Sequence, residues 1–203
     1  MSEGYVFAIK QFSTGTLLQD YHTTQAPDSV GKFVYKTRRD ELLYGQDRLG
    51  TVLSSREYLT DSVALIAIKL LNNAPFSLQA IKEKLQKPEF HLYLGRKSCP
   101  LAIPLSPQLI NENEGFKSAL DNYQWQSILP FHTNSRDNYW FSLTGFKQYY
   151  WEGSMSDFSA ECSDFNPQQV HILTRYDQPR SRKRWQFSSR LENFYQQNSK
   201  ESG

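Results

Sequence analysis

The chain has 203 residues, a net charge of +2 and two cysteines. This length suits one domain with or without a small appendage, and the near-neutral charge excludes a protein that is a polycation over its whole surface. Two distant cysteines, with no Cys or His pair at metal-ligand spacing, predict reduced thiols in a cytoplasmic protein, with no metal and no cofactor. We find no signal-peptide pattern at the N-terminus, and the longest apolar run, residues 63–71, is too short to span a bilayer.

The predicted elements begin with a strand at residues 5–9 and a turn at Gly15. The next segment, residues 20–55, is polar, basic and aromatic, and several prolines and glycines interrupt it. Alternation in residues 32–36 predicts one strand of a projecting hairpin, and residues 51–53 predict its return arm. An excursion of this length inside a compact domain is usually functional or disordered.

The middle of the chain predicts a strand, a helix and a second strand. Residues 62–71 form an apolar run that suits a central strand. Ser77 is an N-cap for a helix over residues 78–85, which has its apolar residues on one face and ends before Pro88. Residues 90–94 are the next strand, and this order is half of a ferredoxin-like α+β unit.

Beyond residue 101 the sequence becomes loop-rich, with a short helix expected at 116–122 and strands at 139–151 and 170–175. We therefore divide the chain into a partial ferredoxin-like domain at 1–101 with its hairpin at about 20–55, a C-terminal β extension at 102–195, and a flexible tail at 196–203.

Charge is distributed unevenly along the chain. Cations outnumber acids in residues 32–56 and 175–190, whereas residues 112–164 are mostly acidic. Two basic segments around an acidic one indicate a polyanion partner on one face, and the alternative is ordinary solvated charge. We assign the acidic, aromatic residues 139–164 to core packing or protein contacts, and residues 180–184 to a site or to a flexible basic linker.

The most informative segment is residues 92–101, LYLGRKSCPL. A strand-like run ends at Gly95, which permits a turn or a close approach of the backbone to a ligand. Arg96 and Lys97 follow as cations suited to phosphate, and Ser98 is a neutral donor. The alternative is an exposed turn after a buried strand.

The basic hairpin allows two kinds of chemistry. Rings between cations suit RNA, because bases stack on aromatic side chains while phosphates meet the cations. Tyr21 and His22, with Lys36 or Arg38, supply a base and a cation as in a metal-independent ribonuclease, but we favour a stacking or hydrogen-bonding pair. Arg56 either reaches RNA or forms an internal salt bridge.

Four motifs occur in one order: DYHT at 20–23, REYLTD at 56–61, YLGRKSCPL at 93–101 and RWQFSSR at 184–190. Over residues 5–195 the chain resembles the CasD family, the subunits of type I-E CRISPR Cascade complexes that cap the 5′ end of the guide RNA. The resemblance implies a RAMP-type ferredoxin-like (RRM-like) α+β fold with a β-hairpin thumb at the handle–spacer junction. It also implies contacts with the large subunit CasA and the backbone subunit CasC, and no catalytic residues.

Members of that family begin with a strand and a helix that precede the segment matched here by residues 5–9. A ferredoxin-like sheet without its first strand has unpaired inner edges, which is costly and prone to aggregation. We therefore expect a fold that is incomplete at its N-terminus. Either the chain is a truncated gene product or another polypeptide supplies the strand and helix, and the split subunit is our hypothesis.

The resemblance leaves two alternative functions, because some relatives in other subtypes cleave precursor RNA. One is a metal-independent processing endoribonuclease, and the other is a truncated-subunit protein that regulates Cascade. For the leading function, the candidate RNA-binding residues are Tyr21, His22, Lys32, Lys36, Arg38, Arg39, Arg56, Tyr93, Gly95, Arg96, Lys97, Ser98, Arg184 and Arg190.

Overall fold

The computed structural model describes residues 4–28, 31, 34–110, 115–124, 146–159 and 165–198. Its helices and strands confirm the α+β class. The chain divides into two compact units, residues 14–62 and the remainder. In chain order the elements are β1 (Tyr5–Ser13), β2 (Thr16–Pro27), α1 (Arg38–Tyr44), η2 (Gln46–Arg48), β3 (Leu49–Thr60), β4 (Val63–Leu70), α2 (Leu78–Gln86), α3 (Phe116–Asp121), β5 (Phe146–Trp151), α5 (Met155–Phe158), η3 (Pro167–Gln169), β6 (His171–Ser181) and β7 (Gln186–Asn198).

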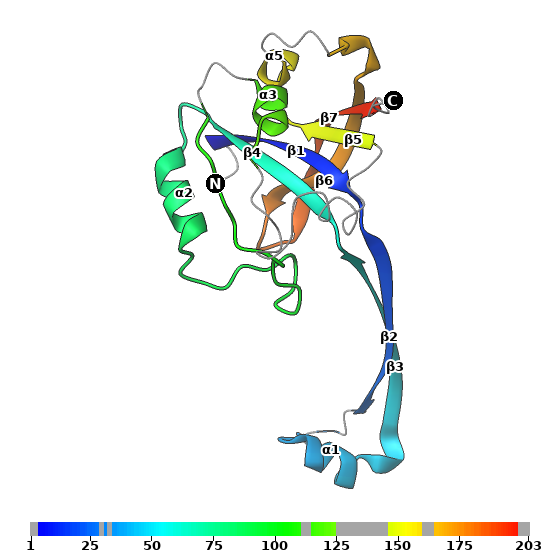
Figure 1. Cartoon of the computed structure of the whole chain (residues 1–203). Helices are drawn as coiled ribbons and strands as arrows, with labels where there is room; N and C mark the ends of the chain where they lie inside the picture. Colours follow the sequence, from blue (N-terminus) through cyan, green and yellow to red (C-terminus); the bar gives the residue numbers. More distant parts are fainter. Residues whose placement is uncertain are drawn as a thin grey trace, which may run out of the picture. The chain divides into compact units, whose positions relative to one another are not determined.

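The larger unit is built on an antiparallel sheet with the strand order β4-β1-β5-β7-β6 (Figure 1). β1 pairs with β4 on one side and with β5 on the other. The boundary expected at residue 101 therefore does not separate two sheets, because the C-terminal strands extend the sheet of β1. β7 continues to Asn198, beyond the expected start of the tail at residue 196.

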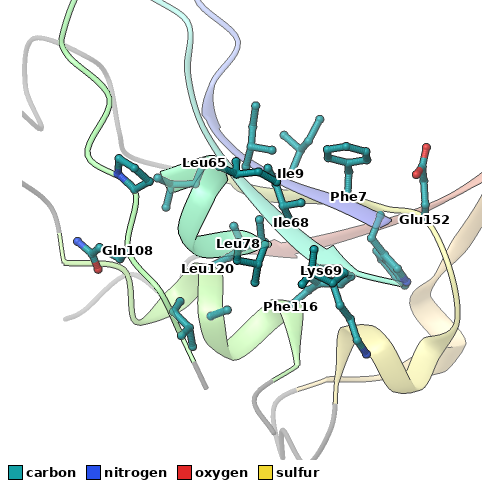
Figure 2. A pocket seen from close by; sticks show the side chains of 18 of the residues that line it. Phe7, Ile9, Leu65, Ile68, Lys69, Leu78, Gln108, Phe116, Leu120 and Glu152 are labelled. Atoms are coloured by element: carbon teal, nitrogen blue, oxygen red, sulfur yellow. The ribbon is translucent and has the colours of Figure 1, made fainter. Parts of the chain in front are cut away.

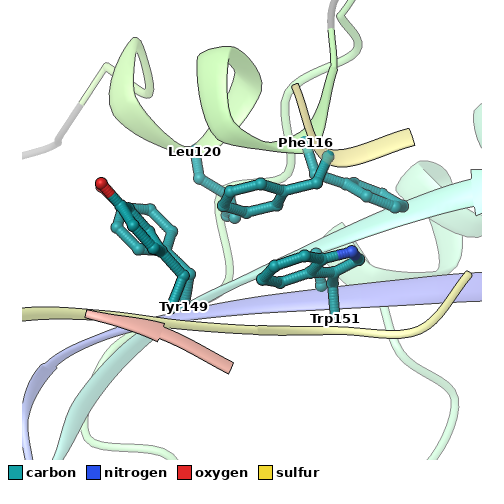
Figure 3. Close-up of a cluster of buried hydrophobic side chains, with 7 residues drawn as sticks. Phe116, Leu120, Tyr149 and Trp151 are labelled. Carbon is teal, nitrogen blue, oxygen red and sulfur yellow. The ribbon is translucent and has the colours of Figure 1, made fainter. Parts of the chain in front are cut away.

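One face of this sheet carries an aromatic core under α3 and α5 (Figure 3). Tyr149 and Trp151 alternate with Tyr150 along β5, so both of their rings point to the covered face. The Trp151 ring stacks on Phe158 with centroids 3.9 Å apart, and Tyr149 meets Phe158 edge-on at 5.5 Å. These stacked and edge-on ring contacts hold α5 on the sheet. Phe116 and Leu120 bring α3 into the same buried cluster.

A buried ionic cluster joins the sheet to α3. Lys10 of β1 and Lys117 of α3 are both buried and both donate to the carboxylate of Asp121, and the Tyr149 hydroxyl donates to it at 2.7 Å. Burial alone would raise the pKa of Asp121, but the hydrogen bonds from Lys10, Lys117 and Tyr149 lower it. Desolvation lowers the pKa of Lys10. Asp121 thus neutralises charge that would otherwise be unpaired inside the unit.

Two strands expected in the middle of the chain differ in the structure. β4 pairs with β1 alone within the described sheet, so it lies at an edge and not in the centre. The strand expected at residues 90–94 is wrong, since only an isolated bridge between Tyr93 and Pro100 forms there. The reason is that a strand needs a hydrogen-bonding neighbour, and no described strand lies beside this segment. α2 agrees with the sequence, and Ser77 Oγ accepts from Ala80 N at 3.2 Å.

The smaller unit is a long two-stranded hairpin of β2 and β3, paired in register from Thr16 opposite Thr60 to Pro27 opposite Leu49. It includes the return arm expected at residues 51–53 and is longer than the expected 20–55. Gly15 begins it at a φ of +75°, and a Cβ there would lie 2.2 Å from the Thr60 carbonyl oxygen, so glycine is required.

The connection between β2 and β3 differs from the expected strand at residues 32–36. Residues 34–36 are not in a strand, and residues 32 and 33 lie outside the described residues. Helix α1 follows instead, because Thr37 and Asp40 form a capping box: Thr37 Oγ1 accepts from Asp40 N at 3.2 Å, and the Asp40 carboxylate accepts from Thr37 N at 3.0 Å. Among the described helices, none is long and apolar enough to cross a membrane.

Candidate nucleic-acid interface

The segment from Tyr93 to Pro100, here called the cationic turn, is closed by backbone hydrogen bonds. Tyr93 pairs with Pro100, and Leu94 N donates to the Cys99 carbonyl oxygen at 2.9 Å. Cys99 N donates to the Arg96 carbonyl oxygen at 2.9 Å. These bonds hold the four residues from 95 to 98 as a loop of defined shape, in place of the strand end that the sequence indicated.

Gly95 gives the cationic turn its open backbone. Its φ of +79° lies in the left-handed region that side chains disfavour, although a Cβ there would meet no atom within 4 Å beyond the chain neighbours. Arg96, Lys97 and Ser98 follow with exposed side chains. The arrangement places two cations and a hydroxyl beside an accessible backbone, which is the chemistry of a phosphate contact.

The hairpin separates the two residues that were considered as a catalytic pair. Because side chains alternate along a strand, Tyr21 and His22 of β2 point to opposite faces. His22 Nδ1 lies 3.2 Å from Asp20 Oδ1, and Asp20 is directly opposite Arg56 of β3. His22, Asp20 and Arg56 therefore share one face, and Tyr21 is exposed on the other. No described ion pair joins Arg56 to Glu57 or Asp61, the internal salt bridge considered as an alternative.

The basic residues near α1 differ in what they contact. Arg38 donates to the Gln25 carbonyl oxygen at 2.7 Å and to Glu41 Oε2 at 2.6 Å, so it fastens α1 to β2. Lys36 and Arg39 are exposed, while Lys32 lies outside the described residues. Of this group, Lys36 and Arg39 are the best placed for a ligand.

The two arginines proposed near the C-terminus have different surroundings. Arg190 forms two bonds with Asp177, at 2.6 and 2.9 Å, and bonds of 3.1 Å with Glu192 and Glu152. The hydrogen bond with Asp177 raises the pKa of Arg190. Those three acids occupy the guanidinium and argue against a phosphate contact, and two of them, Asp177 and Glu152, are distant in sequence. Arg184 is exposed in the ordered turn between β6 and β7, a segment that the sequence allowed as a flexible linker.

No group of three or more His, Cys, Asp or Glu side chains in the described ranges is placed to hold a metal ion. The candidate residues thus fall into the cationic turn of the larger unit and, in the smaller unit, the His22 face and the exposed cations near α1. Each of these sets of residues belongs to its own compact unit.

Comparisons with known proteins give a family match, a related protein and a solved structure. Residues 1–191 match the family described as CRISPR-associated protein (Cas_Cas5). The chain is 34% identical over 124 residues to the "CRISPR system Cascade subunit CasD" of Escherichia coli (strain K12), which is 58% of this chain and 50% of that protein. It thus spans about half the length of this relative. A chain of a solved "CRISPR RNA-guided surveillance complex" superposes with a TM-score of 0.49 and 16% identity, over 97% of this chain and 68% of the other.

Proposed function

This chain belongs to the CRISPR-associated Cas5 family, and from that premise we propose that it is a non-catalytic RNA-binding subunit of a type I-E Cascade complex. In this function the cationic turn holds phosphates of the crRNA 5′ handle, and the β2–β3 hairpin is the thumb at the handle–spacer junction. The observation that carries the proposal is the closed turn at Gly95, which presents exposed Arg96 and Lys97 beside an open backbone. The related Escherichia coli protein is named as a Cascade subunit, and this supports the same assignment.

The double variant Arg96→Ala with Lys97→Ala tests the phosphate contact. We expect weaker binding of the 5′ handle, nearly uniform across spacer sequences, because phosphate contacts carry no base information. The slope of log K against log salt concentration should decrease in magnitude by between about one and two units, because fewer phosphate contacts release fewer counterions. Fluorescence anisotropy over a salt series measures both quantities.

A matched control for this variant is Lys84→Ala with Lys87→Ala, because both lysines are exposed at the end of α2. The control should bind the handle like the wild type. A salt slope that stays unchanged in the Arg96 and Lys97 variant would show that the cationic turn does not contact phosphate, and it would remove the main support for the proposal.

A processing endoribonuclease is the second candidate function, and the His22 face favours it. An imidazole beside a carboxylate, with a guanidinium opposite, supplies a base and a cation for attack by a 2′-hydroxyl. We expect no cleavage of repeat RNA in metal-free buffer. Cleavage by the wild type that is lost in His22→Ala would establish the nuclease and replace the non-catalytic proposal.

The proposed partners include the CasA and CasC subunits of a cytoplasmic Cascade complex. One face of the hairpin suits a protein contact, since Leu17 lies opposite Leu59 and both are exposed. Tyr21 and Leu53 lie on the same face by strand alternation. Exposed apolar groups clustered in this way commonly mark interaction surfaces. A chain that binds these subunits without any affinity for RNA would instead be a regulator derived from a subunit.

We also propose a partner polypeptide that contributes a strand and a helix to the larger unit. β4 has one strand neighbour in the described sheet, and Ile66 on it is 64% exposed. Beside it lies a groove of about 1220 Å³, larger than the roughly 300–1,000 Å³ of a small-molecule pocket. Apolar side chains of β4, α2 and α3 line the groove (Figure 2), and no residue of α2 is buried. Strand addition to an open edge fits these features.

Co-expression with a companion chain bearing a strand and an amphipathic helix tests this partner. The variant Ile66→Lys should lose the companion, because it places a charge at the edge of β4. Ile172→Lys is the matched control, since Ile172 is 63% exposed on β6 at the opposite edge of the sheet. Amide exchange in β4 should slow when the companion is bound. A monodisperse, fully protected β4 in the isolated chain would contradict the proposal.

A further inference from the structure

The turn that joins β6 to β7 is ordered and basic, and we call residues 179–187 the hairpin tip. Ser181 pairs with Gln186, Trp185 N donates to the Arg182 carbonyl oxygen at 3.4 Å, and Arg184 N donates to Ser181 Oγ at 3.3 Å. These bonds fix the loop from 182 to 185. The hairpin tip therefore presents its side chains from a defined backbone.

Positive charge accumulates at the hairpin tip. Arg180, Arg182, Lys183 and Arg184 are all exposed, and residues 178–189 contain no acid. The ion pairs of the described residues include none of these four cations, and the nearest acid in sequence, Asp177, is engaged by Arg190. Four cations without an internal partner have a strong attraction for an anionic ligand.

Two aromatic rings stand among these cations. Trp185 is 75% exposed and Phe187 is 43% exposed, and their rings meet edge-to-face at 5.4 Å and 88°. Phe187 also lies opposite Pro179 across the strand pair. The two rings together form a small, solvent-exposed apolar surface. Folding alone does not account for it, because most of the Trp185 surface stays hydrated in the folded chain.

The backbone at Trp185 is unusual for its residue type. Its φ is +54°, in the left-handed region where glycine and asparagine are comfortable and a bulky aromatic residue is an outlier. Hairpin loops ordinarily place glycine or asparagine at such positions. Backbone strain of this kind concentrates at functional sites, and here it fixes an exposed ring directly after the run of cations.

We infer that the hairpin tip binds single-stranded nucleic acid. An unstacked base lies on the Trp185 ring, and Arg182, Lys183 and Arg184 meet the adjoining phosphates. A duplex fits less well, because its bases are stacked on one another and present no free face. An anionic membrane surface also fits less well, because affinity for it grows with buried apolar area and the tip offers only two rings.

This site goes beyond the proposed function, because it requires neither the 5′ handle nor the cationic turn. The ligand that this site recognises is a phosphate chain with exposed bases, and both RNA and single-stranded DNA have these features. A preference for RNA assigns the ligand to guide or other cellular RNA. A preference for DNA assigns it to a displaced DNA strand.

The test is a titration of the full chain with labelled oligouridylate and oligothymidylate of about 12 nucleotides, within the range of known single-strand site sizes. Neither probe contains a handle sequence. Trp185→Ala should weaken binding of the preferred probe by roughly tenfold or more, and Trp185→Phe should keep most of the affinity, because a ring remains. Arg182→Gln with Lys183→Gln should reduce the salt slope by between about one and two units.

The matched aromatic control is Tyr176→Ala, because Tyr176 is 77% exposed on the same hairpin but lies beside Asp177 and outside the tip. It should bind like the wild type. Circular dichroism checks that each variant is folded. If Trp185→Ala binds both probes as tightly as the wild type, the inference is overturned. It is equally overturned if Trp185→Ala loses binding to phosphatidylserine vesicles and keeps binding to both probes.

Discussion

The base and the tip of the β6–β7 hairpin both carry cations, but those at the base form ion pairs and those at the tip form none in the described structure. At the base, Arg175 contacts Glu192 at 2.9 Å and Arg190 contacts Asp177 at 2.6 Å. At the tip, four cations within five residues have no acidic partner in the described structure. The contrast separates arginines that hold strands together from arginines that are available to a ligand. It also shows why a count of basic residues along the sequence does not locate a binding site.

The largest effect is expected where paired cations are buried. Asp121→Asn leaves Lys10 and Lys117 inside the unit without the carboxylate that both contact. Loss of one partner from a buried pair is strongly destabilising, so we expect the free energy of unfolding to fall by about 3 kcal/mol. Urea unfolding followed by circular dichroism measures it.

A compensated variant sharpens this prediction. Replacing the three side chains together, as Lys10→Met, Lys117→Met and Asp121→Leu, removes the charges along with their partner and should recover most of the loss. A loss below about 1 kcal/mol in Asp121→Asn would mean that water screens these lysines and that paired and unpaired cations differ less than the base and tip suggest.

Acid should reproduce part of the same effect. The folded pKa of Asp121 lies below its ordinary value of 3.8, so the carboxylate stabilises the fold fully above that value. This stability is lost as the pH falls through the lowered pKa. The pKa of Asp157 is lowered as well, because hydrogen bonds from Lys69 and Ser154 outweigh the effect of burial. Unfolding midpoints between pH 6 and pH 2 should fall more steeply in the wild type than in Asp121→Asn, and equal slopes would contradict this assignment.

An intermediate effect is expected at the hairpin base. Arg190→Gln leaves Asp177, Glu192 and Glu152 close together without their shared cation. We expect a loss of about 1 to 2 kcal/mol in unfolding free energy, reduced by the partial exposure of the pairs. Binding of oligonucleotides by the folded variant should be unchanged. If the variant is as stable as the wild type but binds RNA more weakly, Arg190 contacts RNA and does not act mainly in the internal ion pairs.

The smallest effect on stability is expected at the hairpin tip. Arg182→Gln with Lys183→Gln removes charges that no described acid balances, so the unfolding free energy should change by no more than about 0.5 kcal/mol. Thermal melts measure this value beside those of Arg190→Gln. A loss as large as that of Arg190→Gln would mean that the tip and the base do not differ in kind.

Sequence reasoning succeeded where structure is local. The helix α2 was predicted at its observed position because Ser77, the apolar face and Pro88 all lie within a few residues of one another. The capping box of Thr37 and Asp40 was an equally local signal for α1, and it was overlooked because the surrounding alternation favoured a strand. The α+β class and the return arm of the hairpin at residues 51–53 followed from patterns of the same short range, whereas the alternation in residues 32–36 predicted a strand that does not form at residues 34–36.

The failures concern partners that are distant in sequence. Residues 62–71 were correctly read as a strand, but their place at an edge depends on which strands are available to pair. Residues 90–94 have the composition of a strand and no described neighbour to make them one. Arg190 was interpreted from its charge alone, whereas two of its three acidic partners, Glu152 and Asp177, are distant in sequence. Trp185 lies within the motif at residues 184–190, and the two features that distinguish it, its exposure and its backbone conformation, are visible only in the fold.

The strained backbone at Trp185 has an evolutionary consequence. Selection for folding alone would favour glycine or asparagine at a φ of +54°, so drift should remove the ring from any lineage that does not use it. The tip cations are under no such pressure from folding, because they take part in no described ion pair. Ligand preference at the tip is therefore free to diverge between descendants of this protein while the sheet beneath it stays the same.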